Sequence, residues 1–260
     1  MKNIDGFNEV LTKNQYVLQF VMPMELQRIF KVELYGRGAL LDIADGDPSL
    51  IWKVISANCI EKNLVAPQQV HLTRIISAEK CFALPLRPEA DGVYMDCNTR
   101  CAAGLRYADC APVVIAGCEP NPWLYILHSG FAGTFSNIVS FAKVDLLSRF
   151  AKRSLSVDKT TWAWIGPCIC ADCYGRSEDD YKTIMAEKRF AKNNFYKKQG
   201  KIHFDLKNEI KTQLIALGVP KRNIYISQKC TYSDNNKFYS YRAGDKNKRM
   251  LLLAQTMCQN

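Results

Sequence analysis

The sequence predicts a fold that mixes helices with strands, in which the strands form antiparallel or mixed sheets. Short apolar runs rich in Val, Ile and aromatic residues recur at strand length, and runs of helical period lie between some of them. Between residues 68 and 128 the strand-like runs follow one another without a helix, which disfavours a doubly wound parallel sheet. The 260 residues, 48% of them hydrophobic, suffice for a sizeable core. Without a linker or an internal repeat, we expect one domain over residues 1–260.

The expected elements follow from the apolar periodicity and from the residues at their ends. Strands are predicted at residues 16–21, 73–78, 92–96, 111–117, 123–128, 161–166 and 223–227. Helices are predicted at residues 49–63, 135–153, 177–194 and 206–218. The first helix follows a Gly-Asp-Pro turn, and the second places its apolar residues largely on one stripe. The third opens with Ser177 and three acidic residues, which suit a helix N-terminus, and the fourth ends on Gly218.

Composition excludes several classes of function. The formal net charge is +10, but the basic residues are spread along the chain, and there is no zinc-finger, helix-turn-helix or RNP-like motif. We therefore expect no nucleic-acid partner, and the charge suits the attraction of small anions. The sequence contains no signal peptide and no apolar run long enough to span a membrane. Eleven cysteines in such a chain indicate reduced thiols, so we expect a cytoplasmic protein.

Cys110 and His128 stand at the two ends of a pair of predicted strands, and His71 closes an earlier apolar run. Two imidazoles and a thiolate form a three-ligand set suited to zinc, which leaves a fourth position for water or substrate. The same atoms also suit a cysteine nucleophile deprotonated by His128, with Asp109 orienting the ring. The residues alone do not separate the two interpretations, and each histidine alone is more often structural.

The stretch SGFAGTFS follows His128 and joins a predicted strand to a predicted helix. Gly130 and Gly133 permit close approach of the backbone, and Thr134 or Ser136 can cap the helix. Backbone N–H groups behind such a turn bind anions, which predicts a phosphate site beside His128. An ordinary strand-to-helix turn explains the same residues equally well.

Two further segments carry candidate residues. GPCICADCYG holds Cys168, Cys170 and Cys173 but lacks a second half with zinc-site spacing, so we interpret these thiols as structural. The segment 230–250 contains Tyr241, which can stack on a planar base, and Arg242, which can hold an anion. A solvated basic hairpin is the competing interpretation of that segment.

Six blocks of the sequence together resemble a known family. In order they are QQVHLTR, RYADCAPVVI, LHSGFAGT, IGPCICADCYG, HFDL and CTYSDNNKFYSYR. They resemble the laccase-domain family, also called polyphenol-oxidase-like or multicopper-oxidase-like, whose members are described as purine nucleoside phosphorylases. The resemblance extends from about residue 40 to the C-terminus.

The resemblance implies a single α+β domain of layered mixed β-sheets flanked by helices, in an α/β/β/α-type sandwich. It also implies a zinc ion held by His71, Cys110 and His128, phosphorolysis of adenosine, inosine, guanosine and methylthioadenosine, adenosine deamination, and a homodimer. A multicopper set is excluded, because three histidines cannot supply the imidazoles it needs. Two departures from the family pattern stand out: Leu72 replaces a glycine, and Phe131-Ala132 replace a Trp-Arg pair.

The leading hypothesis is a cytoplasmic zinc enzyme of purine nucleoside metabolism, whose partners are nucleosides and phosphate. Catalytic roles fall to Cys110, His128 and Asp109, with Asp172 as an alternative proton shuttle. Substrate and phosphate contacts are assigned to Arg74, Gly130, Gly133, Thr134, Tyr241 and Arg242, with Arg249 as a further anion-binding candidate. The alternatives are a cysteine hydrolase or amidase with a Cys110–His128 dyad, and a degenerate nucleoside-binding protein that has lost turnover with its arginine.

Overall fold

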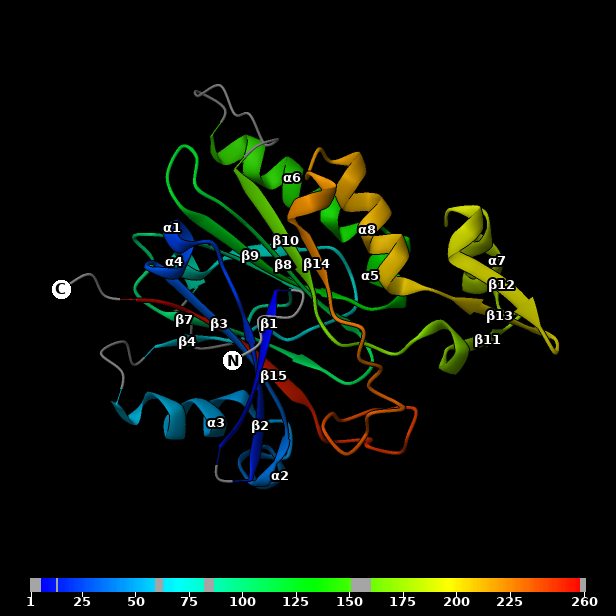
Figure 1. The fold of residues 1–260 in the computed structure, drawn as a ribbon, viewed down its shortest axis with the longest axis horizontal. Coiled ribbons are helices and arrows are strands. Elements are labelled where there is room, and N and C mark those ends of the chain that lie inside the picture. The colour runs from blue at the N-terminus through cyan, green and yellow to red at the C-terminus, as the bar shows by residue number, and fades with distance from the viewer. Residues whose placement is uncertain (1–5, 13, 59–62, 82–86, 151–159, 258–260) are drawn as a thin grey trace.

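Two six-stranded sheets pack against each other at the centre of the computed structural model, which describes residues 6–12, 14–58, 63–81, 87–150 and 160–257 (Figure 1). The first sheet has the order β1-β2-β3-β15-β7-β4, with β1 Phe7–Thr12, β2 Gln15–Phe20, β3 Phe30–Gly38, β4 Leu64–Val65, β7 Ala102–Tyr107 and β15 Met250–Thr256. The second has the order β14-β10-β8-β9-β6-β5, with β5 Ile75–Ser77, β6 Gly92–Asp96, β8 Ala111–Gly117, β9 Trp123–Ser129, β10 Thr161–Ile165 and β14 Ile224–Ile226.

Most neighbouring strands in the two large sheets run antiparallel. The pairs β4–β7, β5–β6 and β10–β14 are parallel. The sheets are therefore mixed, which confirms the pairing expected from consecutive strand-like runs without helices.

Helices lie against both sheets. The α-helices are α1 Met24–Gln27, α2 Ala39–Ala44, α3 Pro48–Ile55, α4 Ala78–Cys81, α5 Phe131–Phe135, α6 Ile138–Arg149, α7 Tyr181–Glu187 and α8 Leu206–Ala216. Helices α5, α6 and α8 cover the second sheet, whereas α2 and α3 pack on β3 and β7 of the first (Figure 1). This arrangement confirms the predicted α+β class. Among the described residues, every helix is too short or too polar to traverse a bilayer.

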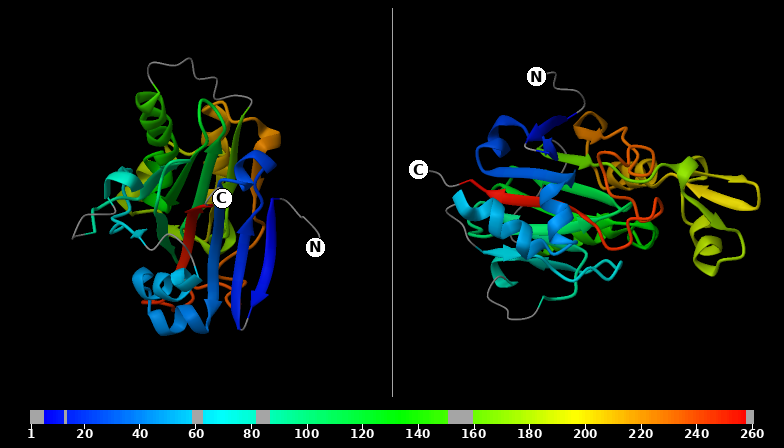
Figure 2. Two further views of the ribbon diagram at one scale, coloured as in Figure 1. Left: turned by 90° about the vertical axis from the view of Figure 1, so that its left-hand side faces the viewer. Right: turned by 90° about the horizontal axis from the view of Figure 1, so that it is seen from below.

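A smaller lobe projects from one end of the molecule (Figure 2). It contains α7 and a three-stranded sheet of order β11-β13-β12, with β11 Gly175–Ser177, β12 Phe195–Lys198 and β13 Lys201–Phe204. The short 3-10 helices are η1 Ser56–Asn58, η2 Ala171–Cys173, η3 Lys192–Asn194 and η4 Lys221–Asn223. The turn η2 leads directly into the lobe.

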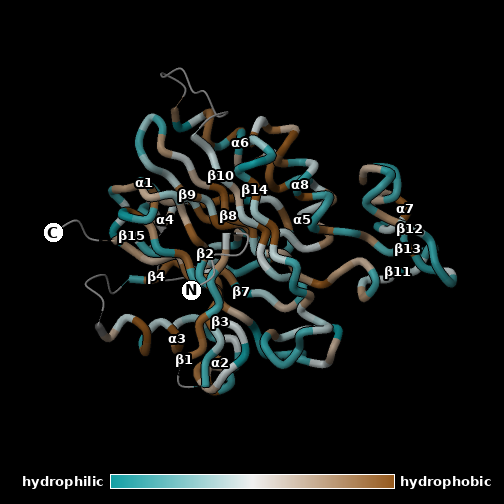
Figure 3. The backbone as a smooth tube through the Cα atoms, in the orientation of Figure 1, coloured by the Kyte–Doolittle hydropathy of each residue, from teal (hydrophilic) through white to brown (hydrophobic). Residues whose placement is uncertain are grey.

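The core has two layers, which the alternation of side chains along β8 and β9 explains. Both strands are buried at every position, and their hydrophobic residues are continuous in sequence (Figure 3). Val114 and Ile126 point to the layer between the sheets, whereas Val113 and Leu127 point to the layer beneath α5, α6 and α8. Because side chains alternate with a period of two, Cys110 and His128 continue the series that faces the first sheet.

All seven predicted strands are confirmed, but the sequence patterns did not predict the central strands of the first sheet. Strand β15, MLLLAQT, is built from Leu and Met, which favour helices intrinsically, and β7, AAGLRY, from small residues. Strand β3 alternates apolar and polar residues in sequence around Val32, Glu33 and Leu34, although all three are buried in the structure. The alternation in β3 therefore does indicate a strand, unlike the sequences of β7 and β15.

Three predicted helices were wrong in extent. The run 49–63 is helical only to Ile55 and then tightens into η1. The run 135–153 is broken at Asn137, which adopts a left-handed φ of 58° and caps α6 by accepting the N–H of Ser140, the role predicted for Thr134 or Ser136. Residues 151–153 of that run and 59–62 of the first lie outside the described residues.

The run 177–194 also begins late. Ser177 belongs to β11, where it pairs with Lys201, and Asp180 caps α7 by accepting the N–H of Thr183 at 2.9 Å. Asp180, three residues later in the chain, therefore caps the helix in place of Ser177. The predicted helix 206–218 is confirmed as α8, and Gly218 follows it with a φ of 97°.

Candidate functional site

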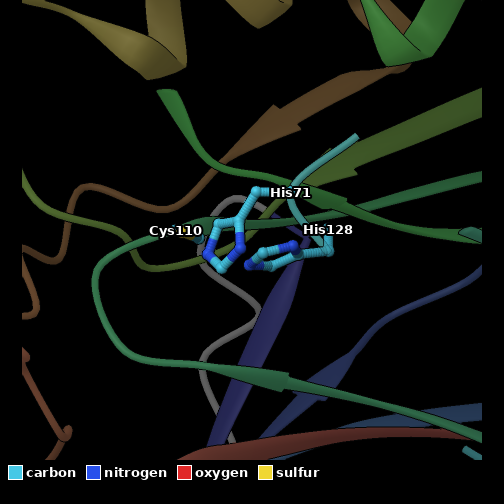
Figure 4. A group of neighbouring side chains, drawn as sticks. All are labelled: His71, Cys110 and His128. Atoms are coloured by element: carbon cyan, nitrogen blue, oxygen red, sulfur yellow. The ribbon is translucent and has the colours of Figure 1, made fainter. Parts of the chain in front are cut away.

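His71, Cys110 and His128 come together at the end of the second sheet. One ligand atom from each lies within 4.8 Å of the others, and the two imidazole rings lie 4.9 Å apart between centroids (Figure 4). His128 is buried, Cys110 is half-buried and His71 is exposed. The structure thus brings together the three residues that the sequence nominated, and one side of the cluster faces solvent.

The register of β8 and β9 explains why Cys110 and His128 meet. Pro112 pairs with His128 and Ala111 with Ser129, so Cys110 stands opposite Gly130. A Cβ atom at residue 130 would lie 2.5 Å from the Cys110 sulfur, closer than two such atoms approach. Gly130 therefore makes room for the thiol, a role different from the anion binding predicted for it.

Asp91, which directly precedes β6, supports both histidines. Its Oδ1 accepts a hydrogen bond from His128 Nδ1 at 2.8 Å. Because a carboxylate only accepts, Nδ1 carries a proton, so Nε2 is the His128 nitrogen that can bind a metal once its own proton has left. The same carboxylate accepts the backbone N–H groups of Val70, His71 and Leu72 at 3.2, 3.0 and 2.8 Å. These bonds hold His71 at a φ of 60°, in the left-handed region.

The charges of the cluster favour an ionised sulfur. Burial opposes ionisation of Cys110, but the imidazoles of His128 and His71 outweigh it and lower the pKa of the thiol to about 6. Burial likewise opposes protonation of His128, whereas Cys110 and Asp91 raise the pKa of this imidazole to about 9. Around neutral pH the pair is therefore a thiolate beside an imidazolium in the metal-free protein.

The donor set fits a zinc ion. Two imidazole nitrogens and one thiolate sulfur are ligands that Zn²⁺ prefers, and a carboxylate behind a ligating imidazole is a common support for it. The half-buried thiol and the exposed imidazole leave one side of the cluster open, as catalytic zinc sites require. The same set lacks the many imidazoles of a multicopper centre.

The cluster lies in a cleft of about 1060 Å³ whose lining is strongly basic. The cationic lining residues are Arg106, Arg176, Lys182, Arg242, Lys246 and Arg249. The acidic ones are Asp45 and Asp109. Tyr174 and Tyr241 add aromatic surface to the same walls. A cleft with this excess of positive charge attracts small anions such as phosphate.

The other residues predicted for the site fall in different places. Tyr241, Arg242 and Arg249 line the cleft. Thr134 is fully buried, with its hydroxyl 2.8 Å from that of Ser129, and Gly133 packs against the His128 backbone. Arg74 and Asp172 are exposed and lie outside the lining residues, and Asp172 accepts a hydrogen bond from Tyr196.

Asp109 lines the cleft, but both of its carboxylate oxygens have partners. Oδ1 accepts the hydroxyl hydrogen of Thr231 at 2.7 Å, and Oδ2 accepts the backbone N–H of Arg242 at 2.8 Å. Its φ of 83° is left-handed. Asp109 therefore joins the Cys110 turn to the loop that carries Tyr241 and Arg242.

Several residues of the site were not found from the sequence, among them Asp91, Arg106 and Arg176. Asp91 directly precedes the strand predicted at residues 92–96, and a carboxylate at the end of a strand could have been recognised as a candidate site residue. Arg106 comes from β7, which the patterns did not predict as a strand. Arg176 comes from the lobe, and nothing in the local sequence places it near Cys110.

The departures from the family pattern are visible in the cleft. Phe131 is buried, and the Arg176 guanidinium lies 4.1 Å from the centroid of its ring. Ala132, which follows Phe131, lines the cleft together with Arg176. A guanidinium from the lobe thus stands beside the position where the family pattern has an arginine. Leu72 is 60% exposed and does not line the cleft.

Comparison with known sequences defines the family. Residues 52–256 match the family described as multi-copper polyphenol oxidoreductase laccase, and the chain belongs to this family. Adenosine deaminase RL5 from an unknown prokaryotic organism is 28% identical over 189 residues, which cover 69% of this chain and 70% of the relative. Purine nucleoside phosphorylase RP494 from Rickettsia prowazekii (strain Madrid E) is 27% identical over 185 residues, covering 70% and 71% of the two chains.

Solved structures share the whole fold. The crystal structure of YlmD from Geobacillus stearothermophilus matches with a TM-score of 0.79 at 20% identity, covering 98% of this chain and 100% of that one. The Bacillus licheniformis hypothetical protein YfiH matches with a TM-score of 0.76, also at 20% identity and with the same coverage. At this identity the likeness shows the fold.

Proposed function

We propose that this protein is a zinc-dependent purine nucleoside phosphorylase that acts on adenosine, inosine, guanosine and methylthioadenosine. The observation that carries the proposal is the cluster of His71, Cys110 and His128, which opens into a cleft lined by basic and aromatic side chains. The names of the relatives, purine nucleoside phosphorylase and adenosine deaminase, support an enzyme of nucleoside metabolism.

His71, Cys110 and His128 would hold the zinc, with Asp91 fixing the His128 tautomer. When bound, zinc supplies a Lewis acid that polarises an oxygen or lowers the pKa of a water molecule. In phosphorolysis, a phosphate oxygen bonds to ribose C1′ while the bond from C1′ to the purine nitrogen breaks and the purine takes up a proton. The protein must hold the phosphate against C1′ and exclude water from that position.

Arginines of the cleft supply the anion site. The Nε of Arg106 is buried and has no hydrogen-bond partner among the described residues, so it remains able to donate to a ligand. Burial and the charges of Arg87 and Arg249 lower the pKa of Arg106, so a bound anion relieves repulsion there. Arg176 and Arg242 also line this cationic wall, and Arg176 forms an ion pair with Asp180 at 2.7 Å.

Aromatic residues supply a surface for the purine. The Tyr241 side chain is 49% exposed, and the Lys246 ammonium lies 3.8 Å from the centroid of its ring. Tyr174 faces Arg242, whose guanidinium carbon lies 5.0 Å from the centroid of the tyrosine ring. A planar base between such rings gains stacking energy without base-specific contacts, which agrees with several purines as substrates.

Adenosine deamination is the second activity proposed for the same site. In that reaction a water oxygen bonds to purine C6 and ammonia leaves, so the products are inosine and ammonia. Phosphorolysis and deamination need different reactants at the cluster, phosphate in one case and water in the other. Product analysis therefore separates them.

The test of the proposal uses purified zinc-loaded protein with inosine, with and without phosphate. The proposal predicts hypoxanthine and ribose 1-phosphate only when phosphate is present. Release of hypoxanthine without phosphate would indicate hydrolysis, and absence of hypoxanthine and of products from the other three nucleosides would refute phosphorolysis. Adenosine without phosphate tests deamination by the release of ammonia.

A cysteine hydrolase or amidase is the second candidate, and one observation favours it. Cys110, His128 and Asp91 form a chain of thiol, imidazole and carboxylate, and the pKa of the thiol is lowered as a nucleophile requires. Metal content decides between the two candidates. Active protein that holds no zinc and loses activity when Cys110 is alkylated would support the hydrolase and contradict the zinc enzyme.

The proposal also includes a cytoplasmic location and a homodimer. Cys97, Cys110, Cys118, Cys168, Cys170, Cys173 and Cys230 carry free thiols, which agrees with a reducing compartment. Light scattering on the purified protein tests the dimer directly. A monomer at the concentrations used for the assay would remove the dimer from the proposal and leave the chemistry untouched.

A further inference from the structure

A second group of metal-binding side chains lies where the chain enters the small lobe. The sulfur atoms of Cys170, Cys173 and Cys230 all lie within 4.8 Å of one another. Cys170 and Cys173 have the Cys-x-x-Cys spacing, and Cys230 follows almost sixty residues later. The sequence suggested structural thiols because the run of Cys168, Cys170 and Cys173 lacked a second half with zinc-site spacing. The structure brings a further sulfur, that of Cys230, from a distant loop.

Backbone hydrogen bonds hold the two segments together. Cys168 forms a parallel bridge with Cys230, and the N–H of Thr231 donates to the carbonyl of Cys168 at 3.3 Å. The turn η2 is closed by the N–H of Cys173, which donates to the carbonyl of Cys170 at 3.1 Å. Both cysteines of the turn therefore face the third thiol without a rearrangement of the backbone.

The surroundings stabilise a thiolate in this group. The N–H of Cys170 donates to the sulfur of Cys230 at 3.3 Å. This hydrogen bond stabilises negative charge on the Cys230 sulfur.

Access separates this group from an ordinary core thiol. Cys170 and Cys173 are half-buried, and the Cys173 sulfur lies 3.6 Å from the hydroxyl of Ser233. Cys168, by contrast, is fully buried. Solvent therefore reaches Cys170 and Cys173, whereas Cys230 is buried and holds the inner position of the group.

We propose that Cys170, Cys173 and Cys230 form a second metal site, which binds Zn²⁺ through three thiolates and a water molecule. An all-sulfur set selects thiophilic ions, and the thiol protons pass to solvent as the metal binds. The site is distinct from the cluster of His71, Cys110 and His128, with which it shares no residue. Its bound ion links the turn before Tyr174 to the loop that carries Tyr241 and Arg242, which are two walls of the cleft.

A metal ion at this site would reinforce hydrogen bonds that already join the same two segments. Both terminal nitrogens of Arg242 donate to the carbonyl of Gly175 at 3.3 Å. These bonds are exposed, so they contribute little by themselves. A metal ion that joins the two segments therefore acts as a clip beside the substrate cleft, and its removal is expected to loosen the lobe without dismantling either large sheet.

Metal counting on reduced, metal-free protein tests the proposal. Wild-type protein is titrated with Co²⁺ and then Zn²⁺, and the variants Cys170→Ser/Cys173→Ser and His71→Ala are titrated in parallel. We expect two equivalents of metal in the wild type and one in each variant. The Co²⁺ bound by the His71 variant should show the stronger sulfur-to-metal charge-transfer absorption, because three thiolates hold it. The control Cys97→Ser/Cys118→Ser should retain two equivalents.

Each other outcome contradicts the proposal. One equivalent in the wild type, or two equivalents in the Cys170/Cys173 variant, would overturn the second site. A Cys170–Cys173 disulfide that forms in preference to metal binding, detected by mass spectrometry, would also overturn it. If the double variant does not fold, the absorption of the second Co²⁺ equivalent in wild-type protein still decides, since a site without thiolates lacks that band. These readouts do not depend on enzyme activity.

Discussion

The two groups of metal-binding side chains differ in what holds them. Cys110 and His128 extend from strands that are buried along their whole length, and Asp91 fixes both histidines. Cys170 and Cys173 lie on a surface turn and reach Cys230 through a few backbone bonds. The first group contains nitrogen and sulfur donors and opens into a basic cleft, whereas the second contains only sulfur.

The difference separates two uses of metal-binding residues. A group set by the register of a central sheet is positioned before any ligand arrives, which catalysis requires. A group formed by two loops becomes ordered only when the ion binds, which suits a metal ion that stabilises the structure. We therefore assign chemistry to the first group and stabilisation to the second, and the predictions below test that division.

The largest effect is expected from Cys110→Ala. Removal of one of three proposed zinc ligands should lower kcat/KM for inosine phosphorolysis roughly 1000-fold, because Lewis-acid stabilisation contributes several kcal/mol. The matched control is Cys118→Ala, since Cys110 precedes β8 and Cys118 follows it. Steady-state kinetics measure both. Equal activity of the two variants would remove Cys110 from the reaction.

In the metal-free protein at neutral pH, Cys110 should be alkylated about 100-fold faster than Cys118. The two imidazoles lower the pKa of Cys110 to about 6, so its reactive thiolate is present above that pH and disappears as pH falls through it. Burial and two glutamates raise the pKa of Cys118, so it stays a thiol. Peptide mass spectrometry after iodoacetamide treatment measures both rates. Zinc should protect Cys110, and a rate midpoint near pH 9 would contradict the geometry.

Asp91→Asn should weaken zinc binding at the first group roughly 10- to 100-fold, as loss of a supporting carboxylate does. The amide cannot supply the charge that holds both His128 Nδ1 and the backbone N–H groups around His71. Asp96→Asn is the control, because Asp91 precedes β6 and Asp96 ends it. Competition with a chelator measures the affinity. Metal at the cysteine group should not change in either variant.

Arg106→Met should raise the KM for phosphate about tenfold with little change in kcat, since a charge-assisted hydrogen bond contributes on the order of 1.5 kcal/mol or more. Arg74→Met is the control, because Arg74 is exposed and does not line the cleft. A larger effect from Arg74 would move the phosphate outside the cleft and restore the role predicted for Arg74 from the sequence.

The parts of this site that the sequence predicted are those carried by local patterns. Cys110 and His128 were recognised because each lies at one end of a continuous apolar run. Those two runs predict the strands β8 and β9. His71 was proposed as a third ligand from its residue type, but its place beside the other two could not be predicted, because its turn depends on Asp91, a contact twenty residues away. Arg176 and Cys230 were missed for a similar reason: the contacts that place them at these sites, with Phe131 and Cys170 respectively, come from other segments, and no periodicity records such contacts.

The first sheet illustrates the same limit. Strand β15 pairs with both β3 and β7, although more than two hundred residues separate it from β3. Its Leu-rich sequence fits a helix as well as a strand. It forms a strand because it pairs with β3 on one side and with β7 on the other. Tertiary pairing therefore decided what local propensity left open.

Diffraction from crystals of zinc-loaded protein, recorded on both sides of the zinc absorption edge, tests the central claim most directly. An anomalous difference peak bonded to a His71 nitrogen, the Cys110 sulfur and His128 Nε2 is the predicted result. No peak among these atoms, in protein that catalyses phosphorolysis at full rate, would contradict the account.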